Sequence, residues 1–138
     1  MDDVRLRHCF LAVDDHDKAI AFYRDTLGFE VRNDVSAYGM RWVTIGAPSQ
    51  HDVNIVLEPP AADPGISAED RAALDDLLAK GLLRGLNFST PDLQATFDRV
   101  VASGAEVIQE PMDQPWGDRD CAFRDPAGNL IRIMQSGG

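Results

Sequence analysis

The sequence predicts an α+β protein built from two copies of one unit, each a strand, a helix and three further strands. The segment that begins at His8 and the segment that begins at Gly85 carry these elements in the same order. The two starting residues are 77 positions apart, and the glycines that follow the two helices, Gly28 and Gly104, are 76 apart. A nearly constant spacing of this kind indicates an internal repeat.

We expect one domain over residues 1–138. Module one covers 1–60, a connecting helical segment covers 61–82, and module two covers 83–138. A chain of this length is typical of a single domain.

Module one is expected to open with a strand over 8–13 that ends at Asp14 and Asp15, where an acidic side chain can cap a helix. The following helix has one apolar face, because its apolar residues recur at intervals of three and four. These residues are Ala19, Phe22, Tyr23 and Leu27. Three strands are then expected at 31–32, 40–45 and 53–58.

Module two repeats this plan. A strand near 85–89 precedes Asp92, which suits the cap of a second helix. The apolar face of that helix comprises Leu93, Phe97, Val100 and Val101. Its three later strands are expected at 107–109, 121–124 and 130–134.

Between the modules, Ser67 is placed to cap a helix over 68–80 that Gly81 ends. The apolar stripe of this helix predicts that it docks on the domain. The stripe comprises Leu74, Leu77 and Leu78. Two interpretations remain open, a simple connection or a lid over a pocket.

The charge balance excludes several classes of partner. Thirteen Lys and Arg residues against 23 Asp and Glu residues give a net charge of −10, which repels nucleic-acid phosphates and anionic lipids. No apolar run approaches the ~20 residues of a membrane span, and the first residues lack a signal-peptide pattern. We therefore expect a cytoplasmic protein without nucleic-acid or membrane partners.

Cys9 and Cys121 are expected to be buried packing residues.

Two segments resemble the vicinal oxygen chelate superfamily, which includes glyoxalases, bleomycin resistance proteins and extradiol dioxygenases. Residues 13–29, VDDHDKAIAFYRDTLGF, are similar to its signature, and residues 115–131 are similar to its closing segment. The resemblance covers nearly the whole chain apart from 61–82. It implies the glyoxalase/bleomycin resistance fold, in which two βαβββ modules form a curved mixed sheet around a cavity, usually completed in a homodimer.

Metal-dependent members of that superfamily place one metal ligand at each of four strand positions. The corresponding residues here are His8, Val56, Gly85 and Arg132. Only His8 can ligate a metal, and Glu58 and Asn87 are the nearest polar alternatives. A divalent ion needs at least three ligands, and Arg132 would repel it by roughly 8 kcal/mol at 4 Å and an effective dielectric constant of 20. We expect neither a metal nor any other cofactor.

Strand alternation and the resemblance together predict which side chains line the cavity. The expected ligand-binding residues are His8, Phe10, Trp42, Asn54, Val56, Glu58, Asn87, Trp116 and Arg132. Plainer interpretations stay open. His8 can be a structural histidine, Glu58 and Arg132 can form an ion pair, and the two tryptophans can be core or dimer anchors.

These observations favour a metal-independent protein that binds and sequesters a small organic ligand without transforming it. The acidic surface would favour encounter with a cationic ligand. One alternative is a metal-dependent glyoxalase-like lyase, isomerase or dioxygenase with displaced ligands. Another is a metal-free acid–base enzyme that uses His8 as the base and Arg132 to stabilise an oxyanion.

Overall fold

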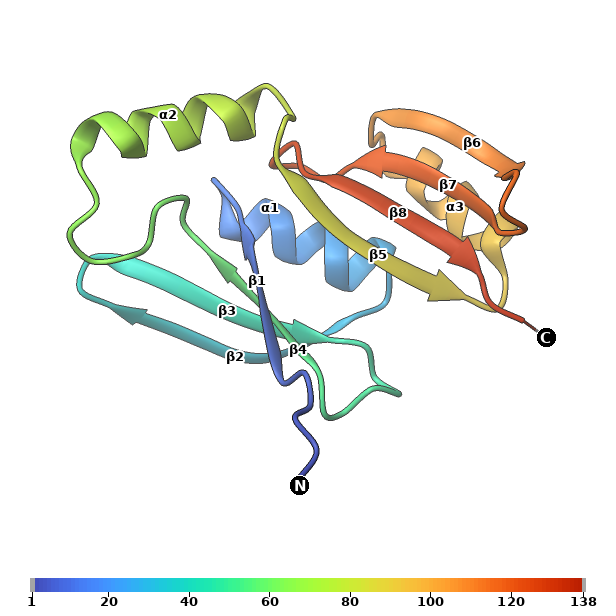
Figure 1. The fold of residues 1–138 in the computed structure, drawn as a ribbon, viewed down its shortest axis with the longest axis horizontal. Helices are drawn as coiled ribbons and strands as arrows, with labels where there is room; N and C mark the ends of the chain where they lie inside the picture. Colours follow the sequence, from blue (N-terminus) through green and yellow to red (C-terminus); the bar gives the residue numbers. More distant parts are fainter. Residues whose placement is uncertain (1, 138) are drawn as a thin grey trace.

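The α+β prediction is confirmed by the structure, a computed structural model that describes residues 2–137. Its strands form two four-stranded mixed sheets (Figure 1). The N-terminal sheet has the order β1 (His8–Ala12), β4 (Asn54–Glu58), β3 (Met40–Gly46) and β2 (Glu30–Ala37). The C-terminal sheet has the order β5 (Arg84–Thr90), β8 (Leu130–Gln135), β7 (Arg119–Arg124) and β6 (Val107–Asp113). In each sheet the first two strands are parallel and the other neighbours antiparallel, as an internal repeat requires.

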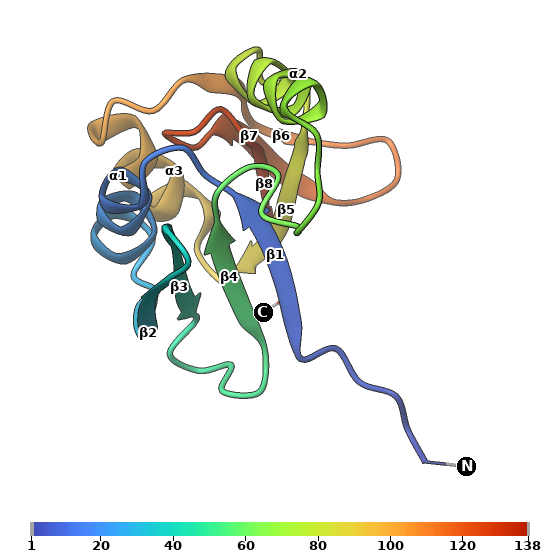
Figure 2. The same cartoon turned by 90° about the vertical axis from the view of Figure 1, so that its left-hand side faces the viewer.

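One helix of each repeat packs against its sheet. In the first, α1 (His16–Ile20) continues into the π-helical turn η1 (Ala21–Thr26), and in the second the helix is α3 (Leu93–Ala102). Asp15 caps α1 by accepting a hydrogen bond from the Lys18 amide at 3.0 Å, and Asp92 caps α3 in the same way. Both helices lie on the same side of the molecule, which leaves the opposite faces of the sheets uncovered by them (Figure 2).

Side-chain alternation in the N-terminal sheet places one set of residues in the core and the other on the open face. The core set comprises Leu11, Val13, Val43, Ile45, Ile55 and Leu57. Most residues of the predicted apolar faces of α1–η1 and α3 are buried, and Leu27 is half-buried. Val101 is 50% exposed, because it follows the buried Val100 by about 100° around the helix and so points past the core.

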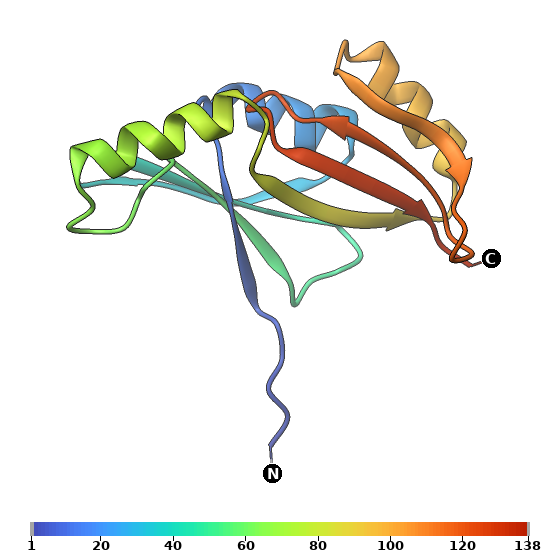
Figure 3. The ribbon, with the colours of Figure 1, turned by 45° about the horizontal axis from the view of Figure 1, so that its top comes forward.

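The connecting helix α2 (Ala68–Ala79) matches its prediction closely. Ser67 caps it through a 3.0 Å hydrogen bond from the Asp70 amide. Its C-terminal end is fixed to module two, because Leu78 is buried and Arg124 donates a 2.7 Å hydrogen bond to the Gly81 carbonyl. Leu77, by contrast, is 37% exposed. Figure 3 shows α2 running along one edge of the molecule, while the N-terminal residues extend away from β1.

The two repeats meet through a buried polar cluster. The Tyr23 hydroxyl, from η1, donates a 2.7 Å hydrogen bond to the carboxylate of Asp125, which lies in the β7–β8 turn. The Asn129 amide reaches back to the Ala12 carbonyl at 2.7 Å. The rings of Phe22 and Phe123 pack beside this cluster at 5.6 Å. The cluster therefore fixes the first repeat to the second.

Neither cysteine forms a disulfide. Cys121 is fully buried, and burial raises its pKa to about 11; Cys9 is half-buried, with a pKa raised by the same effect. Both thiols are thus poor nucleophiles at neutral pH. None of the helices within residues 2–137 is both long and apolar enough to span a bilayer.

Candidate functional site

The open face of the N-terminal sheet gathers most of the predicted ligand-binding residues. The register pairs His8 with Asn54 and Phe10 with Val56 across the parallel β1 and β4 strands. We call this surface the N-terminal open face, comprising His8, Phe10, Trp42, Asn54, Val56 and Glu58. It forms because these side chains alternate with the buried set along the same strands.

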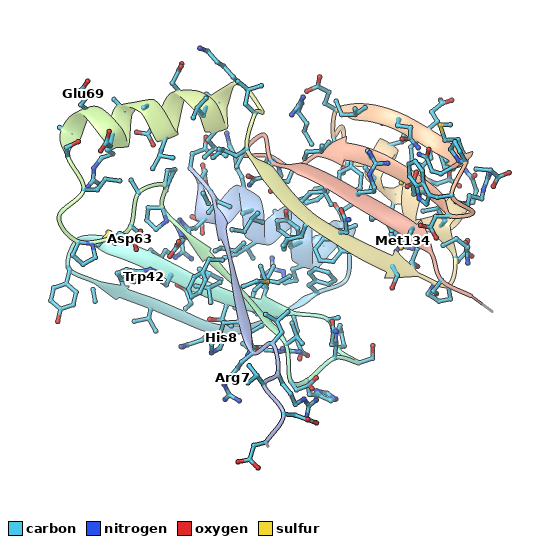
Figure 4. All side chains as sticks on the ribbon, in the orientation of Figure 1. Arg7, His8, Trp42, Asp63, Glu69 and Met134 are labelled. Carbon is cyan, nitrogen blue, oxygen red and sulfur yellow. The ribbon has the colours of Figure 1, made fainter. Side chains whose placement is uncertain are left out.

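The N-terminal open face is an apolar platform with one acidic end. Phe10 is 61% exposed, and its register partner Val56 is half-buried. Trp42, two strands away on β3, is half-buried as well. Burial raises the pKa of Glu58, the nearby Asp63 carboxylate raises it further, and the indole N–H of Trp42 lowers it. Figure 4 shows Asp63, in the segment between β4 and α2, close to the end of the N-terminal sheet that carries Trp42.

Arg32 determines how Asn54 is used, a role that the sequence did not reveal. One nitrogen, Nη1, donates to the Asn54 side-chain oxygen and to the Val53 carbonyl, both at 2.8 Å. Its other terminal nitrogen donates to the carbonyl of Ala47. The side-chain oxygen of Asn54 is therefore used to hold Arg32. Only the side-chain nitrogen of Asn54 is left to donate to a ligand.

Arg132 and Asn87 lie on the C-terminal sheet as register partners across β5 and β8. They line a pocket of about 390 Å³, which we call the arginine pocket. Its other lining residues are Gly85, Leu86 and Leu130. Residues of the N-terminal open face do not contribute to it, so one chain holds the predicted site as two separate groups.

Arg132 forms an ion pair, but not with Glu58, the partner that the sequence suggested. Its partner is Asp120 on β7, at 3.2 Å. Asp120 is 1% exposed, and its carboxylate also accepts 2.8 Å hydrogen bonds from the amides of Gln109 and Gln114. Burial opposes the ionisation of Asp120, but these hydrogen bonds and the charge of Arg132 outweigh it, so its pKa lies below the ordinary value.

Trp116 belongs to neither group. It lies in the loop between β6 and β7 and is 68% exposed. A role as a core anchor is therefore wrong for Trp116, because its ring is mostly in solvent. His16, at the start of α1, is half-buried, with its Nε2 3.2 Å from the Leu57 carbonyl oxygen.

The residues at the four metal-ligand positions do not fit a divalent ion. Val56 and Gly85 supply no ligand atom, and Arg132 is a cation already paired with Asp120. A side chain at position 85 would also need new space, because a Cβ there would lie 2.6 Å from the Leu130 carbonyl. Within residues 2–137 no three His, Cys, Asp or Glu side chains are grouped so that they could hold one metal.

A larger hollow of about 720 Å³ lies where the end of α2 meets the β7–β8 turn. It contains none of the predicted ligand-binding residues. Two charged groups that line it, Arg124 and Asp125, are already hydrogen-bonded to Gly81 and Tyr23. This hollow is therefore a junction between elements and a weaker candidate than the two groups on the open sheets.

Similar proteins include two of known structure that share this fold. UcmS2 is 35% identical with a TM-score of 0.85, over 98% of this chain and 100% of its own. TnmS3, described as an antibiotic binding protein from Streptomyces sp. CB03234, is 30% identical with a TM-score of 0.74, over 99% of both chains. The uncharacterized protein YurT of Bacillus subtilis (strain 168) is 31% identical over 89% of this chain and 92% of its own.

A further relative is described as an enzyme. The probable lactoylglutathione lyase of Vibrio cholerae serotype O1 is 28% identical over 99% of this chain and 94% of its own. Residues 5–133 match the sequence profile of the glyoxalase/bleomycin resistance protein/dioxygenase superfamily. With the paired βαβββ repeats described above, the chain belongs to this superfamily.

Proposed function

We propose that the protein binds a small, largely planar organic molecule and holds it without chemical change. The observation that carries the proposal is the N-terminal open face, where Phe10 and Trp42 present aromatic surface beside Val56. Aromatic rings supply large contact areas and stack on planar ligands. The similarity to TnmS3 supports the same class of function.

Charge supports a ligand that carries a positive group. The chain has a net charge of −10, and Glu58 and Asp63 lie close to each other near Trp42. A cation over the Trp42 ring would be held by the ring quadrupole as well as by these carboxylates. Electrostatic attraction of this kind mainly accelerates encounter.

A second copy of the chain is proposed to complete the site as a homodimer. Phe10 on the N-terminal sheet and Trp116 near the C-terminal sheet are both mostly exposed, at 61% and 68%. If the C-terminal sheet of one protomer faces the N-terminal sheet of its partner, both aromatic surfaces are covered. The ligand then lies between the N-terminal open face and the arginine pocket, which a single chain keeps apart.

The ligand-binding proposal predicts that the protein binds 1-ethylpyrene and, at low salt, binds 1-pyrenemethylammonium more tightly. Probe fluorescence titrations measure both affinities, and added salt should reduce the preference for the cation. Replacing Trp42 with Ala should weaken the binding of both probes by about 5- to 30-fold, since it removes a stacking surface worth about 1–2 kcal/mol.

The matched control is Val101→Ala, which truncates an exposed apolar side chain on α3, away from the N-terminal open face. It should leave both affinities unchanged. Equal losses in the two variants would contradict the proposal, as would failure of both probes to bind. Mass spectrometry should recover the probes unaltered.

The dimer proposal predicts that the protein sediments at twice its chain mass of 15.1 kDa. Phe10→Glu should shift it to the monomer, because a buried unpaired carboxylate at an interface is strongly unfavourable. Val101→Glu places the same charge on α3 and should remain dimeric. Sedimentation velocity separates these outcomes, and a wild-type monomer at all concentrations would reject the dimer.

The glyoxalase-like lyase remains the second candidate because of the Vibrio cholerae relative. It predicts that the protein converts the hemithioacetal of methylglyoxal and glutathione. The change in absorbance on conversion measures this activity. Turnover that His8→Ala abolishes would replace the sequestration proposal. The metal-free alternative requires the proposed dimer, because His8 and Arg132 lie on different sheets of one chain.

A further inference from the structure

Arg132 is held in place by residues of β6 and β7, whereas the arginine pocket is lined by residues of β5 and β8. Its Nη1 atom contacts the Asp120 carboxylate at 3.2 Å and the Gln109 side-chain oxygen at 3.0 Å. Both of these contacts use the same nitrogen. Within residues 2–137, the Nε and Nη2 atoms of Arg132 donate no hydrogen bond to another group of the chain.

Asp120 is itself fixed before it meets the arginine. It is 1% exposed, and the amides of Gln109 and Gln114 each donate to it at 2.8 Å. Gln114 in turn donates to the Gln109 oxygen at 3.3 Å. An arginine whose partner is this constrained loses little further side-chain freedom when it binds a ligand.

Asn87 supplies a second donor at the same place. It is the register partner of Arg132, it lines the same pocket, and it is exposed. The remaining lining residues are glycine and leucines. The pocket therefore combines a fixed guanidinium edge and a side-chain amide with apolar walls, an arrangement that orients a small ligand by a few polar contacts.

We propose that Arg132 and Asn87 form a donor subsite for a planar oxygen acceptor on the ligand, either a carboxylate or a carbonyl conjugated to an aromatic ring. Asp120 is a positioning residue that aims the guanidinium at this oxygen. A guanidinium edge matches both lone pairs of such an oxygen or both oxygens of a carboxylate. The inference rests on the proposed function, because the aromatic part of the ligand occupies the N-terminal open face.

The charge state of the pair favours this class of group. Arg132 and Asp120 together are neutral, so the pocket presents donors without a large net charge. A ligand ammonium group would meet the donor edge of a cation and be repelled. The subsite therefore distinguishes the two ends of the ligand, with a positive group near Glu58 and an oxygen at Arg132.

Three probes of similar size test the subsite on the full-length protein. They are 1-pyrenecarboxylate, 1-acetylpyrene and 1-ethylpyrene, and the last two differ mainly in one carbonyl oxygen. The wild-type protein should bind at least one of the two oxygen-bearing probes about tenfold more tightly than 1-ethylpyrene, equivalent to about 1.4 kcal/mol. A preference for the carboxylate alone identifies an acid as the ligand group, and a preference shared by the ketone identifies a carbonyl.

Arg132→Met should abolish this preference while leaving the affinity for 1-ethylpyrene within about twofold. The matched control is Arg119→Met, since Arg119 lies on the neighbouring β7 and also forms a 3.2 Å ion pair, with Asp113, but is 47% exposed. It should keep the full preference. Added guanidinium ion at millimolar concentration should restore part of the preference to an Arg132→Ala variant.

Asp120→Asn tests the positioning role through the ratio of probe affinities. If Asp120 aims Arg132, this variant loses the preference for oxygen while 1-ethylpyrene still binds. If Asp120 is merely structural, all probes weaken together and the positioning role is rejected. Unfolding curves confirm that each variant is folded at the assay temperature.

The failures of the two proposals can be told apart. If 1-ethylpyrene binds at the N-terminal open face but neither oxygen-bearing probe is preferred, the donor subsite is wrong and the proposed function stands. The same holds if Arg132→Met leaves the preference intact. If none of the probes binds, the proposed function fails and the subsite fails with it.

Discussion

The Asp125→Ala variant is expected to lose about 3–5 kcal/mol of unfolding free energy, which is a large part of the stability of a domain this size. The Asp125 carboxylate accepts four hydrogen bonds. They come from the Tyr23 hydroxyl at 2.7 Å, the Ala127 amide at 3.0 Å, the Asn129 amide at 2.9 Å and the Asn129 side chain at 3.1 Å. The substitution leaves these donors buried without an acceptor, at about 1–3 kcal/mol for each group that water cannot reach.

Urea unfolding measures this loss, with two variants for comparison. Tyr23→Phe removes one donor and keeps the ring, so it should cost about 1–2 kcal/mol. Asp113→Ala removes an aspartate whose side chain is 83% exposed and should change stability by no more than about 0.5 kcal/mol. An Asp125→Ala variant as stable as Asp113→Ala would show that the cluster does not join the two repeats.

The environment of Tyr23 also makes its hydroxyl unreactive. Burial raises the pKa of Tyr23 well above its ordinary value, and the negative charge of Asp125 and the hydrogen bond to it raise it further. The hydroxyl therefore stays protonated at neutral pH and donates to Asp125. The pair links the two repeats.

The fold could be predicted because its signals are local or repeated. The caps at Asp15, Ser67 and Asp92 lie within three residues of the amides that they accept from. The two-residue alternation of β1 and β4 separates Phe10 from Leu11 without any knowledge of the partner strand. These features can be predicted from the sequence because each depends only on residues that are neighbours along the chain.

The candidate site was predictable only in part, because pairings between strands depend on register. Alternation placed Arg132 on an open face, but its partner Asp120 lies on another strand, and β6 meets β7 through irregular pairing at Gln109. Nothing in the sequence indicates that Gln109 and Gln114 converge on Asp120. The separation of the N-terminal open face from the arginine pocket likewise depends on how the sheets meet.

The second large effect is expected at Gly128, in the same turn as Asp125. Its φ is +101°, in the region that favours glycine, and a Cβ there would lie 2.7 Å from the Leu78 carbonyl oxygen in the last turn of α2. Gly128→Ala therefore combines backbone strain of about 1–2 kcal/mol with a backbone clash of about 1–3 kcal/mol. We expect a total loss of about 2–5 kcal/mol in unfolding free energy.

Gly104→Ala separates the two contributions. Gly104 has a φ of +83° with no other atom within 4 Å of an added Cβ, so this variant should show the strain alone. Hydrogen exchange should also accelerate in α2 for Gly128→Ala and not for Gly104→Ala, because only Gly128 contacts that helix. If the two variants lose the same unfolding free energy and hydrogen exchange in α2 is unchanged, the end of α2 moves away from the added Cβ without destabilising the protein. The contact at Leu78 would then not hold the helix, and the interpretation of residues 61–82 as a lid would gain over that of a fixed connection.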